Sequence, residues 1–326
     1  MFFLYFSRRE STGICDGPLH FCTLNLLSLP HLQESNKVRR TVISSSERQR
    51  LLSLAYGYLG SLVEGEDRVQ EALLRFEQAD HASIQNVEAW LTTVVTRLCI
   101  DQLRSAAHRR EVYPGEWLPE PIFQAPDPEQ EAITRSRLSV GLLYLLEKLE
   151  PEQRVVFVLR EVFEHSYQSI AAITGKSEAA CRQLMVRARA ALDRVQQAPP
   201  VLGTIATSLV NRFIDALTQG DEKELLRIMA PDAVLVADGG GKVPSILHPV
   251  YGADRITRFF LGVRRKHGNV FEIRPATVNS SPGMLTFRDG QLVSVACVST
   301  GNDRITAIYS VNNPDKLHLD QKPRRS

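Results

Sequence analysis

Five prolines within eighteen residues constrain this chain more than any other feature. They lie in the segment 111–128, EVYPGEWLPEPIFQAPDP. Proline has a fixed φ and no amide hydrogen, and it drives the preceding residue away from helical geometry, so the segment is predicted to be an extended linker. Its apolar residues are Trp117, Leu118, Ile122 and Phe123. A free tether is normally polar, so we expect this linker to dock on a protein surface.

Three amphipathic helices are predicted before the linker, over about 47–59, 63–77 and 88–110, because apolar residues recur there at helical spacing. The second helix is acidic. In the third, residues three or four positions apart line a polar face: Thr93, Arg97, Asp101 and Arg104. Its end is basic, with Arg109 and Arg110. Taken alone, this third helix is more typical of an ordinary solvated surface helix.

A helix-turn-helix pattern follows the linker. Helices are predicted over about 129–149 and 152–162, and then a short helix at 167–173, a glycine turn, and a last helix that begins at Ser177 and runs to about 195. The last helix carries polar and basic residues: Arg182, Gln183, Arg187, Arg189 and Arg194. Basic helical hairpins are common, so the spacing by itself leaves a DNA-binding motif and a plain hairpin both open.

The pattern changes class after a second proline boundary at 196–200. Helices come first there, and strands separated by glycine turns follow. The predicted strands lie near 233–237, 271–278, 284–288, 291–298 and 304–310. One hairpin turn is predicted at Ser281–Gly283. Helices followed by an antiparallel meander predict an α+β domain.

At 326 residues the chain has room for two or three domains. Its formal net charge of +2 is too balanced to coat nucleic acid by charge alone. The five cysteines are scattered without a CxxC pair, which predicts no disulfide framework, no metal site and reduced thiols in a cytoplasmic protein. No apolar run is long enough to span a bilayer. Arg8 and Arg9 follow the first apolar patch, which is the reverse of the order in a secretory signal. No cofactor is predicted.

Residues in several places carry a resemblance to a known family. One set is Glu66, Asp67, 69–72, 89–91, Asp101, Leu103 and Arg104, and another is 151–154 (PEQR) with the helix-turn-helix. They resemble regions 2 and 4 of an extracytoplasmic-function (ECF) RNA polymerase sigma factor. Three motifs, WLPEP, DGGGK and NPDKL, resemble the ECF group that carries a fused C-terminal SnoaL-like domain. Their residues are Trp117, Leu118, Pro119, Glu120 and Pro121; Asp238, Gly239, Gly240, Gly241 and Lys242; and Asn313, Pro314, Asp315, Lys316 and Leu317.

The resemblance implies a multidomain fold. Two all-α sigma domains, the region 2 helical bundle and the region 4 helix-turn-helix, precede an α+β SnoaL-like (NTF2-like) cone. The implied order is a poorly ordered extension at 1–45, region 2 at 46–111, the proline-rich linker at 112–133, region 4 at 134–196, a linker at 197–203, the SnoaL-like domain at 204–311 and a tail at 312–326.

The resemblance also implies a function: a sigma factor that directs core RNA polymerase to promoter DNA. Residues implied to dock on the β′ clamp helices are Asp67, Gln70, Glu71 and Leu74. Residues implied at the −10 element are Thr93, Arg97, Asp101, Arg104, Arg109 and Arg110. Residues implied at the −35 element are Ser177, Arg182, Gln183, Arg187 and Arg189. Many family members carry Asn where Arg97 stands, so base contact and backbone contact both stay open for this side chain.

Regulation in cis is the last implication. The three motifs would form an interdomain contact through which the SnoaL-like domain acts in place of a separate anti-sigma factor, and region 4 would also meet the β flap of the polymerase. A small ligand in the cone stays open.

Two alternatives are a stand-alone helix-turn-helix regulator and a SnoaL-like isomerase or cyclase. The acid/base candidates for the enzyme are Asp232, Asp238, His248 and Tyr251. No spacing among them demands catalysis, so the chain is predicted not to be an enzyme.

Overall fold

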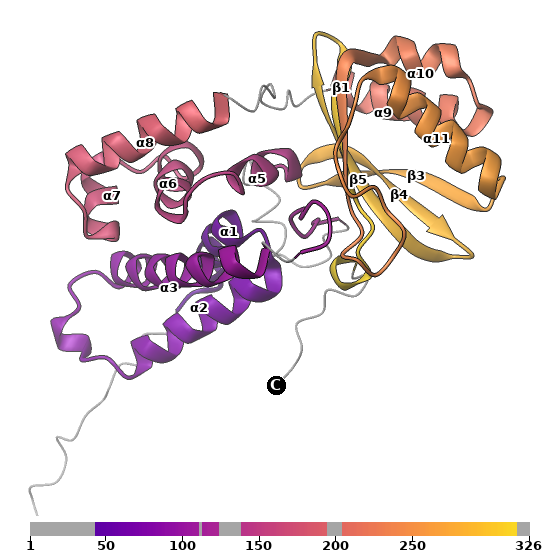
Figure 1. Cartoon of the computed structure of the whole chain (residues 1–326). Coiled ribbons are helices and arrows are strands. Elements are labelled where there is room, and N and C mark those ends of the chain that lie inside the picture. The colour runs from indigo at the N-terminus through magenta and orange to yellow at the C-terminus, as the bar shows by residue number, and fades with distance from the viewer. Residues whose placement is uncertain (1–42, 111–112, 124–137, 194–203, 318–326) are drawn as a thin grey trace, which may run out of the picture. The chain divides into compact units, whose positions relative to one another are not determined.

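The computed structural model describes residues 43–110, 113–123, 138–193 and 204–317, drawn in colour in Figure 1. All of them belong to one compact unit, Ile43–Ser326. For residues 106–110 and 204–205 the description covers the backbone alone.

Three helices form the first part of this unit: α1 (Ser45–Leu59), α2 (Leu62–Glu77) and α3 (Val87–Arg110). Ser44 accepts a hydrogen bond from the Glu47 amide (3.2 Å) and so caps α1. Gly60 ends α1 in the left-handed conformation with φ 67°. A 3₁₀ turn, η1 (His81–Ser83), connects α2 with α3. The three helices agree with the periodicity of the sequence.

The second helical part contains α5 (Val140–Leu146), α6 (Pro151–Phe157), a π-helical turn η2 (Val158–Val162), α7 (Tyr167–Thr174) and α8 (Glu178–Asp193). Gly175, with φ 70°, makes the turn between α7 and α8, as predicted for a helix-turn-helix. The helix predicted over 129–149 is present but shorter in its described part, where α5 covers Val140–Leu146. Ser139 is extended and caps α5 by accepting from the Leu142 amide (3.1 Å), so the helix begins at Val140. Residues 129–137, and Arg194 after α8, lie outside the described residues.

The C-terminal part has the predicted α+β architecture. Its elements are α9 (Thr204–Gln219), α10 (Glu222–Ile228), β1 (Met229–Asp238), β2 (Val250–Tyr251), α11 (Ala253–His267), β3 (Phe271–Val278), β4 (Ser281–Arg288), β5 (Gln291–Gly301), β6 (Arg304–Val311) and η3 (Pro314–Lys316). The strands form one sheet in the order β2-β1-β6-β5-β4-β3. β1 runs parallel to β6 and every other pair is antiparallel, so the sheet is mixed where a pure meander was predicted.

The turn between β3 and β4 differs from the predicted one. Ser281–Gly283 belongs to β4, and the turn is formed by Asn279 (φ 48°) and Ser280 (φ 59°). Asn tolerates the left-handed region better than most residues because its short side chain can bond locally. Gly283 is required for packing, because a Cβ there would lie 2.3 Å from the Ala296 carbonyl oxygen. The Ser-Pro-Gly signal therefore marks a close strand contact.

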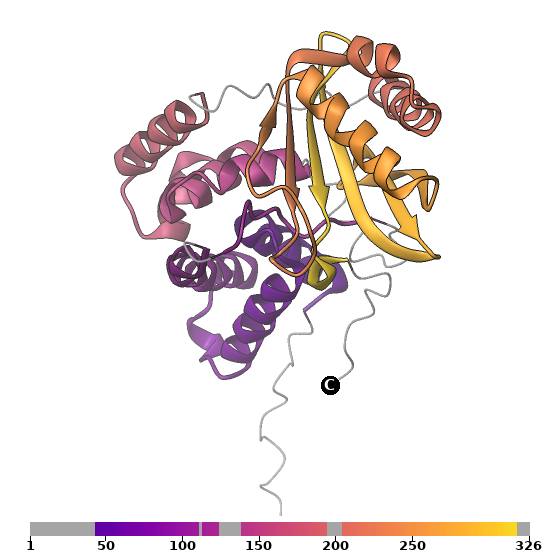
Figure 2. The same ribbon diagram turned by 45° about the vertical axis from the view of Figure 1, so that its right-hand side comes forward.

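The apolar residues gather in three clusters. The first joins α1, α2 and α3 with α5, α6, α7 and α8, so both helical parts share it. The second lies between α9, α10 and α11 and one face of the sheet. The third covers the other face, and there the linker supplies Leu118 and Phe123 while α5 supplies Val140 and Tyr144. The linker is thus part of a core, as its apolar composition predicted, and Figure 2 shows α9–α11 and α5 on opposite sides of the sheet.

Candidate promoter-binding and interdomain sites

The outer face of α2 carries the residues implied for polymerase binding. Asp67, Gln70 and Leu74 are exposed, and Leu74 is 51% exposed although it is apolar. Glu71 is half-buried and forms ion pairs with Arg68 (2.9 Å) and Arg75 (2.5 Å). The face therefore combines the exposed Leu74 with two carboxylates, of which Glu71 already has cationic partners.

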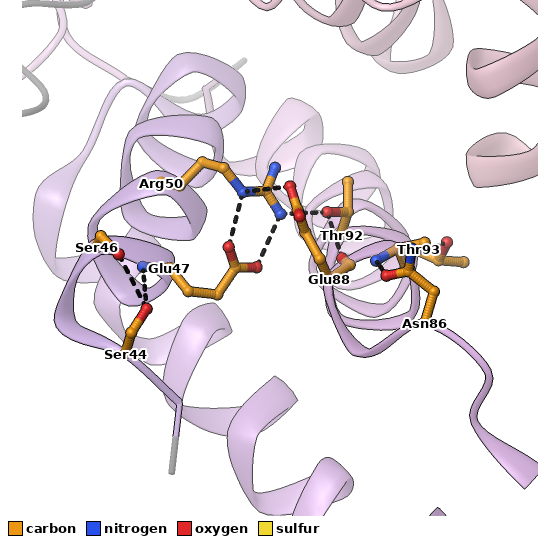
Figure 3. A network of polar contacts seen from close by, with 9 residues as sticks. Ser44, Ser46, Glu47, Arg50, Asn86, Glu88, Thr92 and Thr93 are labelled. Atoms are coloured by element: carbon orange, nitrogen blue, oxygen red, sulfur yellow. Dashed lines mark hydrogen bonds and ion pairs between the residues drawn. The ribbon is translucent and has the colours of Figure 1, made fainter. Parts of the chain in front are cut away.

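A polar network fixes the start of α3 on α1 (Figure 3). Arg50 of α1 lies between Glu47 and Glu88 and donates to the Thr92 hydroxyl (2.6 Å). Asn86 accepts from the Ala89 amide (3.0 Å) and caps α3. Thr92 is 2% exposed, so this network determines which side of α3 faces inward.

The opposite side of α3 carries the residues implied for the −10 element. Thr93 donates to the Ala89 carbonyl (2.8 Å), and Arg97 and Asp101 are exposed. Arg104 is 58% exposed and binds Glu152 of α6 at 2.9 Å. The side chains of Arg109 and Arg110 lie outside the described residues.

The exposed side of α8 carries the residues implied for the −35 element. Ser177 caps the helix by accepting from the Ala180 amide (3.2 Å). The side chains of Arg182, Gln183, Arg187 and Arg189 are all exposed. Arg182 pairs with Glu178 (2.8 Å), and Arg189 pairs with Glu161 (2.8 Å).

Sequence reasoning missed Val186 on this face. Its side chain is 68% exposed, although valine is among the most frequently buried residues. An apolar side chain on a recognition helix suits the methyl group of thymine. Its helical position, four residues after Arg182 and three after Gln183, was the available signal.

The two helical parts are held together around Glu152. Its carboxylate accepts from Arg104 of α3 (2.9 Å) and from Lys176 of the α7–α8 turn (3.0 Å). The hydrogen bond from Lys176 is the main cause that lowers the pKa of Glu152. Nearby, Arg154 is buried and pairs with Glu147, and burial lowers the pKa of its guanidinium to about 9. In this conformation α3 and α8 are therefore attached to one core.

Asp238 is the first of two polar anchors that hold the linker. Its carboxylate is fully buried and accepts from the Leu118 amide (2.9 Å), the Tyr113 hydroxyl (2.6 Å) and the Lys316 ammonium (2.7 Å). Lys316 lies 4.0 Å from the centre of the Trp117 ring. Burial, and then the Asp238 carboxylate, raise the pKa of Tyr113, so its hydroxyl stays protonated and donates. Residues of WLPEP, DGGGK and NPDKL thus meet at one charge.

The glycines of DGGGK allow the C-terminal tail and the linker to pack closely against this turn. A Cβ on Gly240 would lie 2.3 Å from the Asn313 amide group, and one on Gly241 would lie 2.8 Å from Pro114. Both glycines have positive φ, 61° and 68°. Lys242 forms an ion pair with Asp315. Glycine is therefore needed at both positions for conformation and for space.

Glu120 of the linker reaches α2. Its carboxylate is 5% exposed and accepts from the Leu62 amide (2.9 Å) and the Ser61 hydroxyl (3.3 Å). Its own amide donates to the Gly60 carbonyl (2.8 Å). A carboxylate at a helix N-terminus is favoured by the free amide groups and by the helix dipole. The linker consequently stabilises the first turn of the helix implied to bind polymerase.

Asn279 is the second anchor, and sequence reasoning missed it. Its side-chain oxygen accepts from the Ile122 amide (2.9 Å), and its side-chain nitrogen donates to the Tyr56 hydroxyl (2.7 Å) and the Leu138 carbonyl (3.0 Å). Tyr56 in turn donates to the Glu120 carbonyl (2.7 Å). Asn279 is 3% exposed. One side chain from the C-terminal sheet therefore bonds to α1, to the linker and to the segment before α5.

The acid/base candidates are not assembled. Asp232, His248 and Tyr251 are exposed, whereas Asp238 is buried under the linker. Within the described ranges, no hydrogen bond or ion pair joins any two of them. No group of His, Cys, Asp or Glu side chains in the described part of the chain could hold a metal ion, and no described helix is long and apolar enough to cross a membrane.

A pocket of about 390 Å³ lies between α9 and the β3–β4 hairpin. Its polar lining is neutral and comes from Thr207, Asn211, Thr277 and Ser280. Whether a small ligand binds in this domain stays a prediction.

Comparison with known proteins identifies both helical parts. Residues 44–109 match the family model for Sigma-70 region 2, and residues 139–192 match the model for Sigma-70, region 4. The chain is 37% identical to the ECF RNA polymerase sigma factor SigJ of Mycobacterium tuberculosis (strain ATCC 25618 / H37Rv), over 83% of this chain and 90% of the relative. It is 31% identical to the probable ECF RNA polymerase sigma factor SigI of Mycobacterium tuberculosis (strain CDC 1551 / Oshkosh), over 83% and 92%.

A solved structure extends the likeness to the C-terminal part. The crystal structure of the Mycobacterium tuberculosis extracytoplasmic function sigma factor SigJ superimposes with a TM-score of 0.70 at 33% identity, over 83% of this chain and 95% of that one. The predicted fold class is confirmed: two helical sigma regions and a C-terminal domain of helices and a mixed sheet. The chain belongs to the family of ECF RNA polymerase sigma factors.

Proposed function

We propose that the C-terminal domain regulates this sigma factor in cis by holding the linker 113–123 against region 2. The observation that carries the proposal is the burial of the linker between two partners. Leu118 and Phe123 pack on the sheet, while Glu120 caps α2. Each anchor of the C-terminal domain, Asp238 and Asn279, also binds a linker amide.

The regulated step is the separation of regions 2 and 4. The −10 and −35 elements are named for positions about 25 base pairs apart, or roughly 85 Å of B-DNA at 3.4 Å per base pair. Helices that share one hydrophobic core, as α3 and α8 do, lie much closer together than that. The closed conformation therefore cannot engage both elements, and a linker held at two anchors opposes opening.

The finer contacts follow the implied assignment. The exposed face of α2 would dock on the β′ clamp helices, and Glu120 would couple linker docking to the first turn of that helix. On α8, Arg182 and Gln183 are in a position to read base edges in the −35 major groove, and each bidentate pair contributes roughly 1–3 kcal/mol of discrimination. Region 4 would also meet the β flap. No separate anti-sigma factor is needed in this scheme.

Transcription with core polymerase tests the proposal. Deletion from Pro314 onward removes Lys316 but leaves Asn279, so the closed state is weakened and promoter output is expected to rise. Deletion of residues 201–326 uncovers the apolar residues of the linker and α5, so output is expected to fall. Equal output from all three chains would end the claim of regulation in cis.

Recognition is tested separately from regulation. Arg182→Ala should weaken use of a promoter through its −35 element, and Arg212→Ala, which removes an arginine of the C-terminal domain, is the matched control. If the chain never joins core polymerase but binds duplex tightly, the stand-alone regulator replaces this proposal.

A further inference from the structure

We propose that helix α11 of the C-terminal domain is an additional contact for the phosphate backbone of duplex DNA. The inference rests on the sigma-factor assignment for the presence of DNA and not on the regulatory proposal. Its substrate is the backbone of double-stranded DNA, read without regard to sequence.

The charge on α11 is unusual for this chain. The whole chain has a formal net charge of only +2. Within α11, Asp254 is outnumbered by five cations: Arg255, Arg258, Arg264, Arg265 and Lys266. By comparison, α8 carries three arginines in its described length against Glu178 and Asp193. Among the described side chains, the local positive charge that DNA binding requires is therefore most concentrated on α11, which lies outside regions 2 and 4.

Four of these cations, all except Arg264, lie on the outer side of the helix. Ala253, Ile256 and Thr257 are buried against the domain. The exposed residues recur at helical spacing and form a stripe: Arg255, Arg258, Phe259, Arg265 and Lys266. At 1.5 Å per residue the stripe is about 16 Å long, which spans several phosphates of one strand. Figure 2 shows α11 on the side of the sheet away from α5.

Ordinary helix chemistry explains only part of this charge. Cations in the last turn are favoured by the helix dipole, and Arg264 also donates to the Thr218 carbonyl (2.8 Å). Arg258 pairs with Asp254. Arg255, however, stands in the first turn, where the dipole disfavours a cation. Among the described residues, the side chains of Arg255, Arg265 and Lys266 have no ion-pair or hydrogen-bonding partner.

Gly262 lies on the same stripe, between Phe259 and Arg265. A glycine inside a helix is about 1 kcal/mol less favourable than alanine. A Cβ at this position would meet nothing within 4 Å, and Gly262 does not have a positive φ. Neither packing nor backbone conformation within the protein requires glycine here. An absent side chain between cations instead allows another backbone to come close to the helix.

Duplex DNA fits this stripe better than a protein partner does. The centres of protein interfaces are depleted in charged residues, whereas four of the five exposed residues of the stripe are cations, and Phe259, 37% exposed, is its one aromatic residue. Phosphate contacts need only accessible cations. Contacts from cations to phosphates carry no sequence information, so we expect binding that does not depend on sequence.

The test measures binding of the full chain, without polymerase, to a 30-base-pair duplex of random sequence. The variant Arg255→Ala/Arg265→Ala/Lys266→Ala removes three phosphate contacts. Each contact contributes about 0.9 to the slope of log affinity against log salt, so the slope should fall by about 2.7. Between 50 and 200 mM salt, the parent chain should then lose about 40-fold more affinity than the variant.

The matched control is Arg227→Ala/Arg274→Ala/Arg288→Ala, which removes the same charge from other exposed positions of the domain. It should leave the slope near that of the parent chain. Equal slopes for both triple variants would reduce the effect to net charge and overturn the site. An α11 variant that binds DNA normally but loses core polymerase would assign the stripe to a protein instead. Because neither measurement depends on linker release, failure here leaves the regulatory proposal standing.

Discussion

The two anchors of the linker use opposite chemistry. Asp238 is a buried carboxylate whose partners include the Lys316 ammonium. Asn279 is a buried neutral amide, and it donates and accepts without any charge. Asp238 binds the linker and the C-terminal tail, whereas Asn279 also reaches Tyr56 of region 2.

The difference shows that the anchor expected to bind the linker more strongly is not the one that contacts region 2. A buried charge that loses its partner is destabilising by about 3–5 kcal/mol, whereas a neutral buried group left unpaired costs about 1–3 kcal/mol. We therefore expect Asp238 to hold the linker more strongly. Asn279, although weaker, ties the C-terminal domain directly to a sigma helix.

The largest effect is expected from Asp238→Ala, because it removes the carboxylate that accepts from the Lys316 ammonium, the Tyr113 hydroxyl and the Leu118 amide. The free energy of local opening at Leu118 should fall by about 3–5 kcal/mol, measured by amide hydrogen exchange. Adding Lys316→Met removes the ammonium that Asp238 neutralised and should restore part of the loss. Exchange at the parent rate in the single variant would mean that Asp238 is not an anchor.

Asn279→Ala should have the next largest effect. It breaks three hydrogen bonds and strains a residue with φ 48°, so protection of the Ile122 amide should fall by about 1–3 kcal/mol. The matched control is Asn302→Ala, which places the same strain (φ 50°) in an exposed turn. If both variants lose the same stability, the strain alone is responsible and the interdomain bonds contribute nothing.

Glu120→Gln tests the contact between the linker and α2 of region 2. Glutamine keeps an acceptor for the Leu62 amide but loses the charge at the start of α2. A loss of about 1 kcal/mol, or roughly fivefold faster exchange in the first turn of α2, is expected. Glu116→Gln is the control, since Glu116 binds Tyr144 (2.9 Å) away from α2. Equal effects of the two variants on exchange in α2 would mean that Glu120 does not stabilise that helix.

Glu152→Gln should have the smallest effect, because its ion pairs with Arg104 and Lys176 are partly exposed. Such pairs contribute at most about 1 kcal/mol. The folded-state pKa of Glu152 is lowered, so its stabilisation is present above the unfolded pKa and is lost as the pH falls through the folded one. The gap in urea midpoint between parent and variant should thus be widest at neutral pH. A gap that widens in acid would contradict the assignment.

Local signals predicted much of the fold. Apolar periodicity located α1, α2 and α3, and Gly175 marked the turn before α8. The helix predicted over 129–149 is shorter in its described part, because Ser139 caps α5 and Leu149 lies in the turn after it. The predicted turn at Ser281–Gly283 failed because Gly283 serves a strand contact.

The candidate site was predictable where a motif carries it. WLPEP, DGGGK and NPDKL do meet, around Asp238. Asn279 and Val186 escaped because an asparagine in a turn and a valine in a helix are locally ordinary. What sets them apart is burial in one case and exposure in the other, and neither can be read from neighbouring residues.

By itself the sequence determined the helices on either side of the linker, the break between them and the class of the C-terminal domain, because helical period, prolines and strand turns are local properties of the chain. The sigma regions followed from the resemblance of short motifs to a known family. Tertiary structure alone decided that the linker completes a core on the far face of the sheet. It also decided that Glu120 caps α2 and that Asn279 bonds to Tyr56, 223 positions away. Contacts at that separation depend on how domains pack, and packing is set by burial and hydrogen-bond satisfaction across the whole fold.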